Sequence, residues 1–164
     1  MYKIRKASKL AEKVFLMDIE APRVAKHCKP GQFVIVKMGK EGERIPLTIC
    51  DYDREEGIIT IVFQSVGLST EKMACLKEGD YFQDVAGPLG CASELIDIDI
   101  EKLKNMKLLF VGGGVGAAPV YPQVKWMKEH GVNVDVIIGA RSKDYIILED
   151  QMKAAAENYY PCTD

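Results

Sequence analysis

Lys107-Leu-Leu-Phe-Val-Gly-Gly-Gly-Val-Gly-Ala-Ala-Pro119 is the stretch of this sequence with the clearest structural signal. Its apolar residues Leu108 to Val111 run without a polar break, which is typical of a strand buried on both faces. Glycines follow at once, and apolar residues then recur at helical spacing up to Gly131, where we expect the helix to end. A strand, a glycine turn and a helix in this order can bind a nucleotide pyrophosphate, because the glycines let the backbone approach the phosphates and the helix N-terminus attracts the anion.

The glycine pattern Gly112-x-Gly114-x-x-Ala117 matches the dinucleotide-binding fingerprint, with alanine at the third position. The same pattern also occurs in a plain tight turn between a buried strand and its covering helix. Dinucleotide-binding folds usually place an acid after the next strand, but the expected strand, Val132 to Ile138, runs into Gly139-Ala-Arg-Ser-Lys-Asp144 without one at that place. From this loop alone, nucleotide binding and a structural turn are equal alternatives. We place Pro119 and Pro122 in the first helical turn, where a missing N–H costs little.

Length, composition and charge are those of an ordinary globular protein. The chain has 164 residues, 48% of them apolar, and a net charge of −2, which gives no electrostatic reason to expect binding to nucleic acid or to an anionic membrane. The segment Met1 to Ala7 lacks the apolar core of a signal peptide, and no apolar run approaches membrane-spanning length. The five cysteines are scattered without a C-x-x-C pair. We therefore expect free thiols, no metal site in this chain and a cytoplasmic location.

The first half of the chain reads as short strands separated by turns. We expect strands at Lys3–Leu10, Val14–Glu20, Gln32–Met38, Ile45–Cys50, Ile58–Gln64 and Tyr81–Val85. Their regular spacing predicts a small antiparallel barrel. Gly67 interrupts this pattern, and we expect Ser69 or Thr70 to cap a short helix that ends at Gly79.

The second half is predicted to be an α/β domain. The segment Cys91 to Asn105 is charged and irregular, and we expect it to link a barrel domain, residues 1–98, to a nucleotide-binding domain, residues 106–164. A partial helix, Glu149 to Asn158, and a short tail, Tyr159 to Asp164, follow the second strand. Two parallel strands are too few for a stable doubly wound sheet. The sequence thus predicts an N-terminal antiparallel Greek-key β-barrel followed by a truncated Rossmann-like α/β domain.

Six short motifs, taken in their order and spacing, resemble those of the ferredoxin–NADP(+) reductase superfamily. They are Pro30-Gly-Gln-Phe33, Ile45-Pro-Leu-Thr48, Val66-Gly-Leu-Ser-Thr70, Leu76-Lys-Glu-Gly-Asp80, Gly87-Pro-Leu-Gly90 and Val111-Gly-Gly-Gly-Val-Gly-Ala-Ala-Pro119. Within that superfamily the chain is most similar to the FAD-binding small (alpha) subunit of NADH-dependent ferredoxin–NADP(+) oxidoreductase, also called sulfide dehydrogenase. The electron transfer subunit of dihydroorotate dehydrogenase is a close second. The resemblance implies a barrel that binds FAD and an α/β domain that binds NAD or NADP.

The superfamily's flavin motif is Arg-x-Tyr-Ser/Thr, whose last two residues lie against the isoalloxazine ring and its N5 atom. By this resemblance, Pro46, Leu47 and Thr48 match the end of the motif, with Leu47 in place of the aromatic residue. Arg44 lies one residue further from Thr48 than the arginine of the motif does. Two alternatives therefore stay open for Arg44, namely a contact with the flavin phosphates and an exposed charge in the hairpin. Thr48 is expected to offer its hydroxyl to flavin N5, and the alternative is a solvent-facing strand threonine.

The resemblance also implies where the remaining cofactor contacts lie. The residues expected to meet the FAD pyrophosphate, at a helix N-terminus, are Gly67, Ser69 and Thr70. Those expected to line the crevice between the domains are Gly87, Pro88 and Leu89. Those expected to contact the nicotinamide nucleotide are Gly113, Gly114, Gly116 and Pro119. Arg141 would lie near the adenosine ribose, where a cation favours a 2′-phosphate; a surface-loop role is the alternative, so NAD or NADP stays open.

The implied function is that of an NAD(P)H-dependent flavin oxidoreductase subunit, which passes electrons between NAD(P)H and an iron–sulfur centre or ferredoxin through FAD. The cofactors carry this chemistry, so no catalytic side chain is expected. The implied partners are a larger iron–sulfur flavoprotein subunit and ferredoxin, and the 2Fe–2S cluster of such proteins would lie beyond residue 164. Two alternatives stay open, namely the electron transfer subunit of dihydroorotate dehydrogenase and a non-catalytic fragment that binds flavin or nucleotide.

Overall fold

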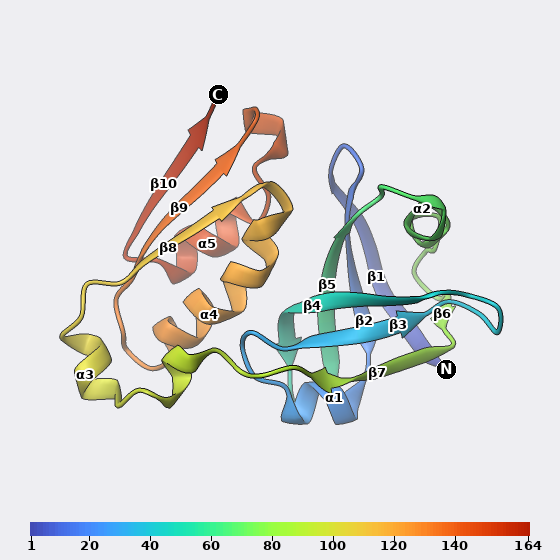
Figure 1. Ribbon diagram of the computed structural model, residues 1–164, viewed down its shortest axis with the longest axis horizontal. Coiled ribbons are helices and arrows are strands. Elements are labelled where there is room, and N and C mark those ends of the chain that lie inside the picture. Colours follow the sequence, from blue (N-terminus) through green and yellow to red (C-terminus); the bar gives the residue numbers. More distant parts are fainter.

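The computed structural model describes residues 1–164 and contains two sheets, of which the larger is antiparallel (Figure 1). Its strands are β1 (Tyr2–Ala11), β2 (Val14–Glu20), β3 (Phe33–Lys37), β4 (Arg44–Asp53), β5 (Ile58–Gln64), β6 (Tyr81–Phe82) and β7 (Asp84–Leu89). They lie in the order β6-β1-β2-β5-β4-β3-β7, so β2 pairs with β5 and not with β3, which is a Greek-key connection. The edge strands β6 and β7 are joined by Gln83 alone, and the sheet therefore curls into a nearly closed barrel. The predicted antiparallel barrel is confirmed.

The inside of the barrel is filled by a single apolar cluster. Alternate residues of the strands face it, as Ile59 and Ile61 of β5 do, both fully buried. Two short helices lie at the ends of the barrel, α1 (Pro22–His27) and α2 (Leu68–Ala74). Met73 of α2 is also fully buried in this cluster. The barrel thus has a core of its own.

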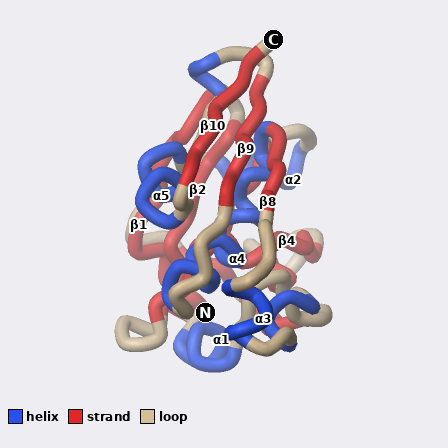
Figure 2. Tube along the Cα trace, turned by 90° about the vertical axis from the view of Figure 1, so that its left-hand side faces the viewer, coloured by secondary structure: helices blue, strands red, loops and turns tan.

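The second sheet is parallel, with the strand order β10-β9-β8. Its strands are β8 (Leu109–Gly113), β9 (Asp135–Ala140) and β10 (Asn158–Thr163), and its main helices are α4 (Ala117–Glu129) and α5 (Glu149–Ala155). Both helices lie on the face of the sheet that is turned toward the barrel, as Figures 1 and 2 show. The short segments around it are η1 (Glu94–Asp97), α3 (Ile100–Lys104), η2 (Gly114–Gly116) and η3 (Lys143–Tyr145).

The strand that begins the glycine motif is buried on one face only, so the prediction of burial on both faces is wrong. Leu109 and Val111 of β8 are 56% and 63% exposed, and Tyr160 of β10 is 51% exposed. In Figure 2 the face of the sheet toward the viewer is covered by neither α4 nor α5. Burial on both faces requires a helix on each side of a parallel sheet, and here both helices lie on the same side.

Several predicted boundaries also differ from the structure. The expected tail is strand β10, so the sheet has three strands and not two. The second parallel strand begins at Asp135 and not at Val132, the helix after it ends at Ala155, and the supposed irregular linker contains η1 and α3. Pro122 lies in the interior of α4 and not in its first turn. Gly131, by contrast, follows the helix with a φ of 71°, which confirms it as the glycine at the helix end.

Candidate functional site

A cleft of about 640 Å³ lies between the barrel and the parallel sheet. The barrel contributes the turn between β1 and β2 and the end of β5, and the parallel sheet contributes the residues that follow β8 and β9. The lining residues are Glu12, Lys13, Val14, Gln64, Ser65, Val66, Gly114, Val115, Ala140, Arg141 and Tyr145. Open parallel sheets bind their ligands beyond the carboxyl ends of the strands. This cleft is in that position, and it contains two of the residues expected from the sequence, Gly114 and Arg141.

The glycine turn after β8 contains glycines of two kinds. A Cβ atom on Gly112 would lie 3.1 Å from Cδ1 of Ile138, so this glycine allows close packing between β8 and β9. A Cβ atom on Gly113, Gly114 or Gly116 would meet no atom within 4 Å. Gly114 has a φ of 54°, a conformation that other residues adopt only with strain. The turn therefore leads directly into α4 and leaves open space on its outer side.

Pro119 is the third residue of α4, on the first turn of the helix. Proline has no N–H to donate, and the first residues of a helix lack an intrahelical partner in any case, so it fits there without loss. The first turn of α4 thus begins at the glycine turn, with the positive end of the helix dipole directed toward it. Gly113, Gly114, Gly116 and Pro119 are adjacent in space as well as in sequence.

Arg141 follows β9 and is held by two contacts inside the cleft. Its guanidinium lies over the ring of Tyr145, 3.7 Å from the ring centroid, and its Nη2 is 3.7 Å from Oε2 of Glu12. The hydroxyl of Tyr145 donates a hydrogen bond to the same Glu12 oxygen. Reasoning from the sequence did not find Glu12, because Glu12 and Tyr145 are 133 residues apart in the chain and nothing in a two-residue hairpin turn signals such a contact.

The residues expected to contact the flavin ring lie on both faces of β4. Arg44, Pro46 and Thr48 share its outer face, and Arg44 is exposed with its Nη1 3.2 Å from Oδ2 of Asp84. Leu47 points the other way, pairs with Val34 across the strands and packs against the barrel core. Arg44 is thus an exposed residue in an ion pair with Asp84.

Thr48 is half-buried at one end of a row of residues that crosses three strands. It pairs with Phe33 of β3, which in turn pairs with Leu89 of β7. In β7, the peptide bond between Gly87 and Pro88 is cis, and a Cβ atom on Gly87 would lie 2.7 Å from Cγ1 of Val34. Gly87, Pro88 and Leu89 therefore lie against β3 at the edge of the barrel, and they do not line the cleft described above.

The predicted helix cap at Ser69 or Thr70 is wrong, because α2 is capped by Gly67. Thr70 is the third helical residue, and its hydroxyl reaches back to accept hydrogen bonds from the backbone N–H groups of Val66 and Gly67, at 2.9 and 3.0 Å. A threonine can satisfy orphan donors from this position as well as from the cap. Ser69 donates a hydrogen bond to the carboxylate of Glu43 in the loop before β4. The structure thus brings Ser69 next to the residue that precedes Arg44.

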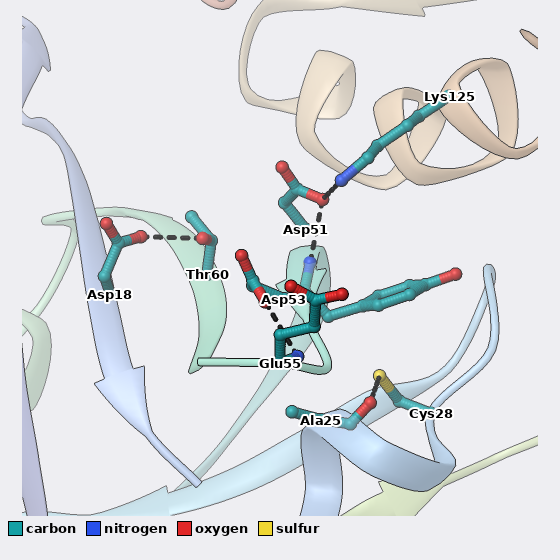
Figure 3. Close-up of polar contacts among 9 residues, drawn as sticks. Asp18, Ala25, Cys28, Asp51, Asp53, Glu55, Thr60 and Lys125 are labelled. Atoms are coloured by element: carbon teal, nitrogen blue, oxygen red, sulfur yellow. Dashed lines mark hydrogen bonds and ion pairs between the residues drawn. The ribbon is translucent and has the colours of Figure 1, made fainter. Parts of the chain in front are cut away.

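Figure 3 shows a separate polar cluster where β4 contacts α4. Oδ1 of Asp51 accepts hydrogen bonds from Nζ of Lys125, at 2.6 Å, and from the backbone N–H of Tyr52, at 2.8 Å. Burial by itself lowers the pKa of Lys125, but the hydrogen bond and the charge of Asp51 outweigh that effect, and the pKa is raised overall. This ion pair joins the barrel to the parallel part of the molecule. It lies outside the cleft.

No group of three or more His, Cys, Asp and Glu side chains is arranged as metal ligands would be. Cys28 and Cys50 are buried free thiols, and Cys75, Cys91 and Cys162 are exposed ones. None of the helices has the length and apolar character needed to cross a membrane.

The fold is closely similar to that of known flavin enzymes. The structure of NADH-dependent reduced ferredoxin–NADP oxidoreductase superposes with a TM-score of 0.86 at 42% sequence identity, over 98% of this chain and 56% of that one. This chain has a ferredoxin reductase-like fold. The resemblance found in the six motifs is therefore confirmed. No family model matches the sequence.

Several sequence relatives are named as electron transfer subunits or as homologs of one. The electron transfer subunit homolog of dihydroorotate dehydrogenase B (NAD(+)) from Thermotoga maritima is 46% identical over 154 residues, which are 94% of this chain and 52% of that protein. The corresponding subunit from Fusobacterium nucleatum is 34% identical over 158 residues, 94% of this chain and 59% of that protein. The chain therefore spans a little over half the length of the curated relatives that it matches.

Proposed function

We propose that this chain is the FAD-binding part, and the beginning of the NAD(P)-binding part, of a flavin-dependent electron transfer subunit. In this role it passes electrons between NAD(P)H and an iron–sulfur centre or ferredoxin. The observation that carries the proposal is the cleft between the barrel and the carboxyl ends of the parallel strands, with an open glycine turn on its wall. The names of the homologous proteins support the same function.

The glycine turn fits a nicotinamide nucleotide. Gly113, Gly114 and Gly116 carry no side chain on the open side of the turn, so a pyrophosphate can approach the backbone closely. Pro119 then lies beside the phosphates on the first turn of α4. Arg141 and Ala140 lie at the end of the neighbouring strand, where the adenosine ribose is expected.

The outer side of the barrel fits a flavin. Thr48 can donate its hydroxyl to the ring, and Pro46 and Leu89 supply apolar contact from the same side of the sheet. The first turn of α2 has backbone N–H groups without intrahelical partners, and Gly67, Ser69 and Thr70 are the residues proposed for the FAD pyrophosphate there. Arg44 would have to leave Asp84 to reach a phosphate. Leu47 would support the ring from the core side of β4, and Gly87 and Pro88 would form the wall beside it.

When bound, the two cofactors supply the hydride and single-electron chemistry themselves. The residues of this chain bind them, orient them across the cleft and exclude water from it. No side chain in the cleft is needed as an acid or a base for this role. The proposed partners, a larger iron–sulfur flavoprotein subunit and ferredoxin, would receive or supply the electrons. We further propose that residues 1–98 are the FAD domain, that residues 106–164 begin a Rossmann-like domain, and that the protein is cytoplasmic, where exposed free thiols are common.

The first test is an absorbance spectrum of the purified protein, followed by anaerobic addition of NADH and then of NADPH. Flavin bands at about 375 and 450 nm that bleach with a nicotinamide nucleotide are the expected result. A colourless protein that takes up no added FAD would refute the flavin proposal. Bound flavin that neither nucleotide bleaches would favour the alternative of a non-catalytic flavin-binding fragment.

A matched pair of glycine variants separates nucleotide binding from packing. Gly113→Ala adds a methyl group to open space, so we expect unchanged stability and at least about tenfold weaker nucleotide binding. Gly112→Ala adds the same group 3.1 Å from Ile138, so we expect lower thermal stability as its main effect. Isothermal titration and thermal unfolding of both variants check these expectations. Unchanged nucleotide affinity in Gly113→Ala would contradict the proposed binding site.

The second candidate is that this chain belongs to the electron transfer subunit of a dihydroorotate dehydrogenase. The names of two relatives, one an electron transfer subunit of that enzyme and the other a homolog of it, favour this candidate. Dihydroorotate should then also reduce and bleach the flavin, once the partner subunit that oxidises dihydroorotate is added. Ferredoxin-dependent reoxidation without any response to dihydroorotate would favour the first candidate.

A further inference from the structure

One feature of dinucleotide-binding folds is missing from this sequence. Such folds usually place an Asp or Glu at the end of the strand after the glycine turn, where its carboxylate accepts a hydrogen bond from the ribose 2′-OH of NAD. Here β9 ends at Ala140, and Arg141 follows. Taken alone, a cation at this place would favour the 2′-phosphate of NADP.

The structure brings an acid to this place from the barrel. Glu12 forms the turn between β1 and β2 together with Lys13, and the backbone carbonyl of Lys13 accepts a hydrogen bond from the N–H of Ser65 at 2.8 Å, which ties the turn to the end of β5. The Glu12 carboxylate enters the cleft wall beside Arg141 and Tyr145. The barrel therefore sets the backbone position of Glu12, and Tyr145 and Arg141 hold its carboxylate from the loop after β9.

The contacts of Glu12 leave it able to bind a ligand. Both the hydroxyl of Tyr145 and the guanidinium of Arg141 engage Oε2, and Oε1 takes part in no hydrogen bond. The side chain is 66% exposed. Glu12 also places a negative charge next to Arg141, whose guanidinium lies flat on the Tyr145 ring. A dianionic phosphate near Arg141 would thus meet a carboxylate, whereas a hydroxyl group would find an acceptor.

We propose that Glu12 selects NAD over NADP, with its carboxylate in the role of the missing acid after β9. Glu12 accepts a hydrogen bond from the ribose 2′-OH and repels a 2′-phosphate, and Tyr145 and Arg141 position it. This inference rests on the proposed nucleotide binding at the glycine turn. Lys13 lines the same cleft without an ion-pair partner, and its charge acts on the phosphates that both nucleotides share.

The test is isothermal titration of the purified, flavin-loaded protein with NAD+ and with NADP+. In Glu12→Gln we expect the ratio of the two Kd values to shift toward NADP+ by about tenfold or more, because a charged hydrogen-bond acceptor is lost and a repulsion is removed. Tyr145→Phe should shift the ratio in the same direction by less. Lys13→Gln should weaken the binding of both nucleotides equally. The matched control is Glu20→Gln, since Glu20 pairs with Arg5 on the barrel surface away from the cleft and should leave the ratio unchanged.

The other outcomes contradict the proposal in distinguishable ways. If Glu12→Gln and Tyr145→Phe weaken the binding of NAD+ and of NADP+ equally, Glu12 only holds the hairpin to the loop after β9. If neither variant changes any affinity, the ribose does not reach Glu12. If the flavin-loaded wild-type protein binds neither nucleotide, the proposed function itself fails, and the selectivity of Glu12 fails with it.

Discussion

The barrel sheet and the parallel sheet bury their apolar residues in different ways. The barrel closes over a cluster of 16 buried residues that come only from its own strands, its short helices and the two residues that flank α1. The cluster beneath the parallel sheet has 19 buried residues, and it includes residues of the barrel strands, namely Ala11, Val14, Leu16, Cys50 and Val62. The core of the parallel part is therefore partly made of the barrel. A closed sheet provides its own core, whereas a small open sheet depends on what its helices pack against.

The largest expected difference appears when the two parts are separated. Residues 1–98 should keep a folded barrel, because their main cluster stays complete, whereas residues 106–164 should not fold alone, because α4 and α5 lose the barrel surface beneath them. Far-UV circular dichroism and urea unfolding of the two fragments measure this. Cooperative unfolding of the isolated fragment 106–164 would contradict the comparison.

Two buried methionines offer the same substitution in each core. Met127 of α4 and Met73 of α2 are both fully buried, one in each cluster. Either methionine-to-alanine change should cost about 3 kcal/mol of unfolding free energy. In Met127→Ala, the fluorescence of Trp126, the only tryptophan, should change at lower urea than the β-sheet signal of the barrel. In Met73→Ala this order should not appear, and coincident transitions in both variants would mean that the two parts unfold as one.

The ion pair between Asp51 and Lys125 tests the contact between the two parts more finely. Both side chains are about one-third exposed, at 30% and 31%, so Lys125→Met should cost only about 1 kcal/mol of unfolding free energy. Because the folded-state pKa of Lys125 is raised, its contribution is fully present below the ordinary lysine pKa and is lost as the pH rises through the raised value. We expect the difference in unfolding free energy between wild type and variant to shrink from neutral to strongly alkaline pH, which urea unfolding can measure.

The control for that ion pair is Lys104→Met. Lys104 pairs with Glu101 at a helix surface, where the carboxylate is 76% exposed. An exposed pair three residues apart contributes little, so this variant should unfold almost as the wild type does. An equally small effect of Lys125→Met would mean that the Asp51 contact does not hold the two parts together.

The smallest expected effect is a difference in thiol labelling. Burial raises the pKa of Cys28 to about 11 and that of Cys50 further above its usual range, so neither should react with iodoacetamide in the native protein at neutral pH. Cys28 lies in the barrel cluster, and Cys50 lies in the cluster under the parallel sheet. At low urea we expect Cys50 to react first, which mass spectrometry can follow. Earlier reaction of Cys28 would reverse the proposed order of stability.

Local sequence patterns determined the elements and their order. The spacing of the apolar runs predicted the barrel strands, since short runs separated by turns at regular intervals are typical of a small antiparallel barrel. The glycine motif predicted the turn before α4, since a positive φ at Gly114 and close packing at Gly112 both require glycine. Six short motifs in order were enough to identify the ferredoxin reductase-like fold, which the structural comparison confirmed.

Only the tertiary structure decided which surfaces are covered and which distant residues meet. An unbroken apolar run has the same sequence pattern whether one face of its strand is buried or both are. The exposure of Leu109 and Val111 therefore could not be predicted from the sequence. The meeting of Glu12 with Arg141 and Tyr145 depends on how the barrel hairpin packs against the loop after β9. Local propensities act over a few residues, whereas such contacts depend on the packing of whole elements. The sequence thus identifies the glycine turn, but only the fold places the charge of Glu12 in the same cleft.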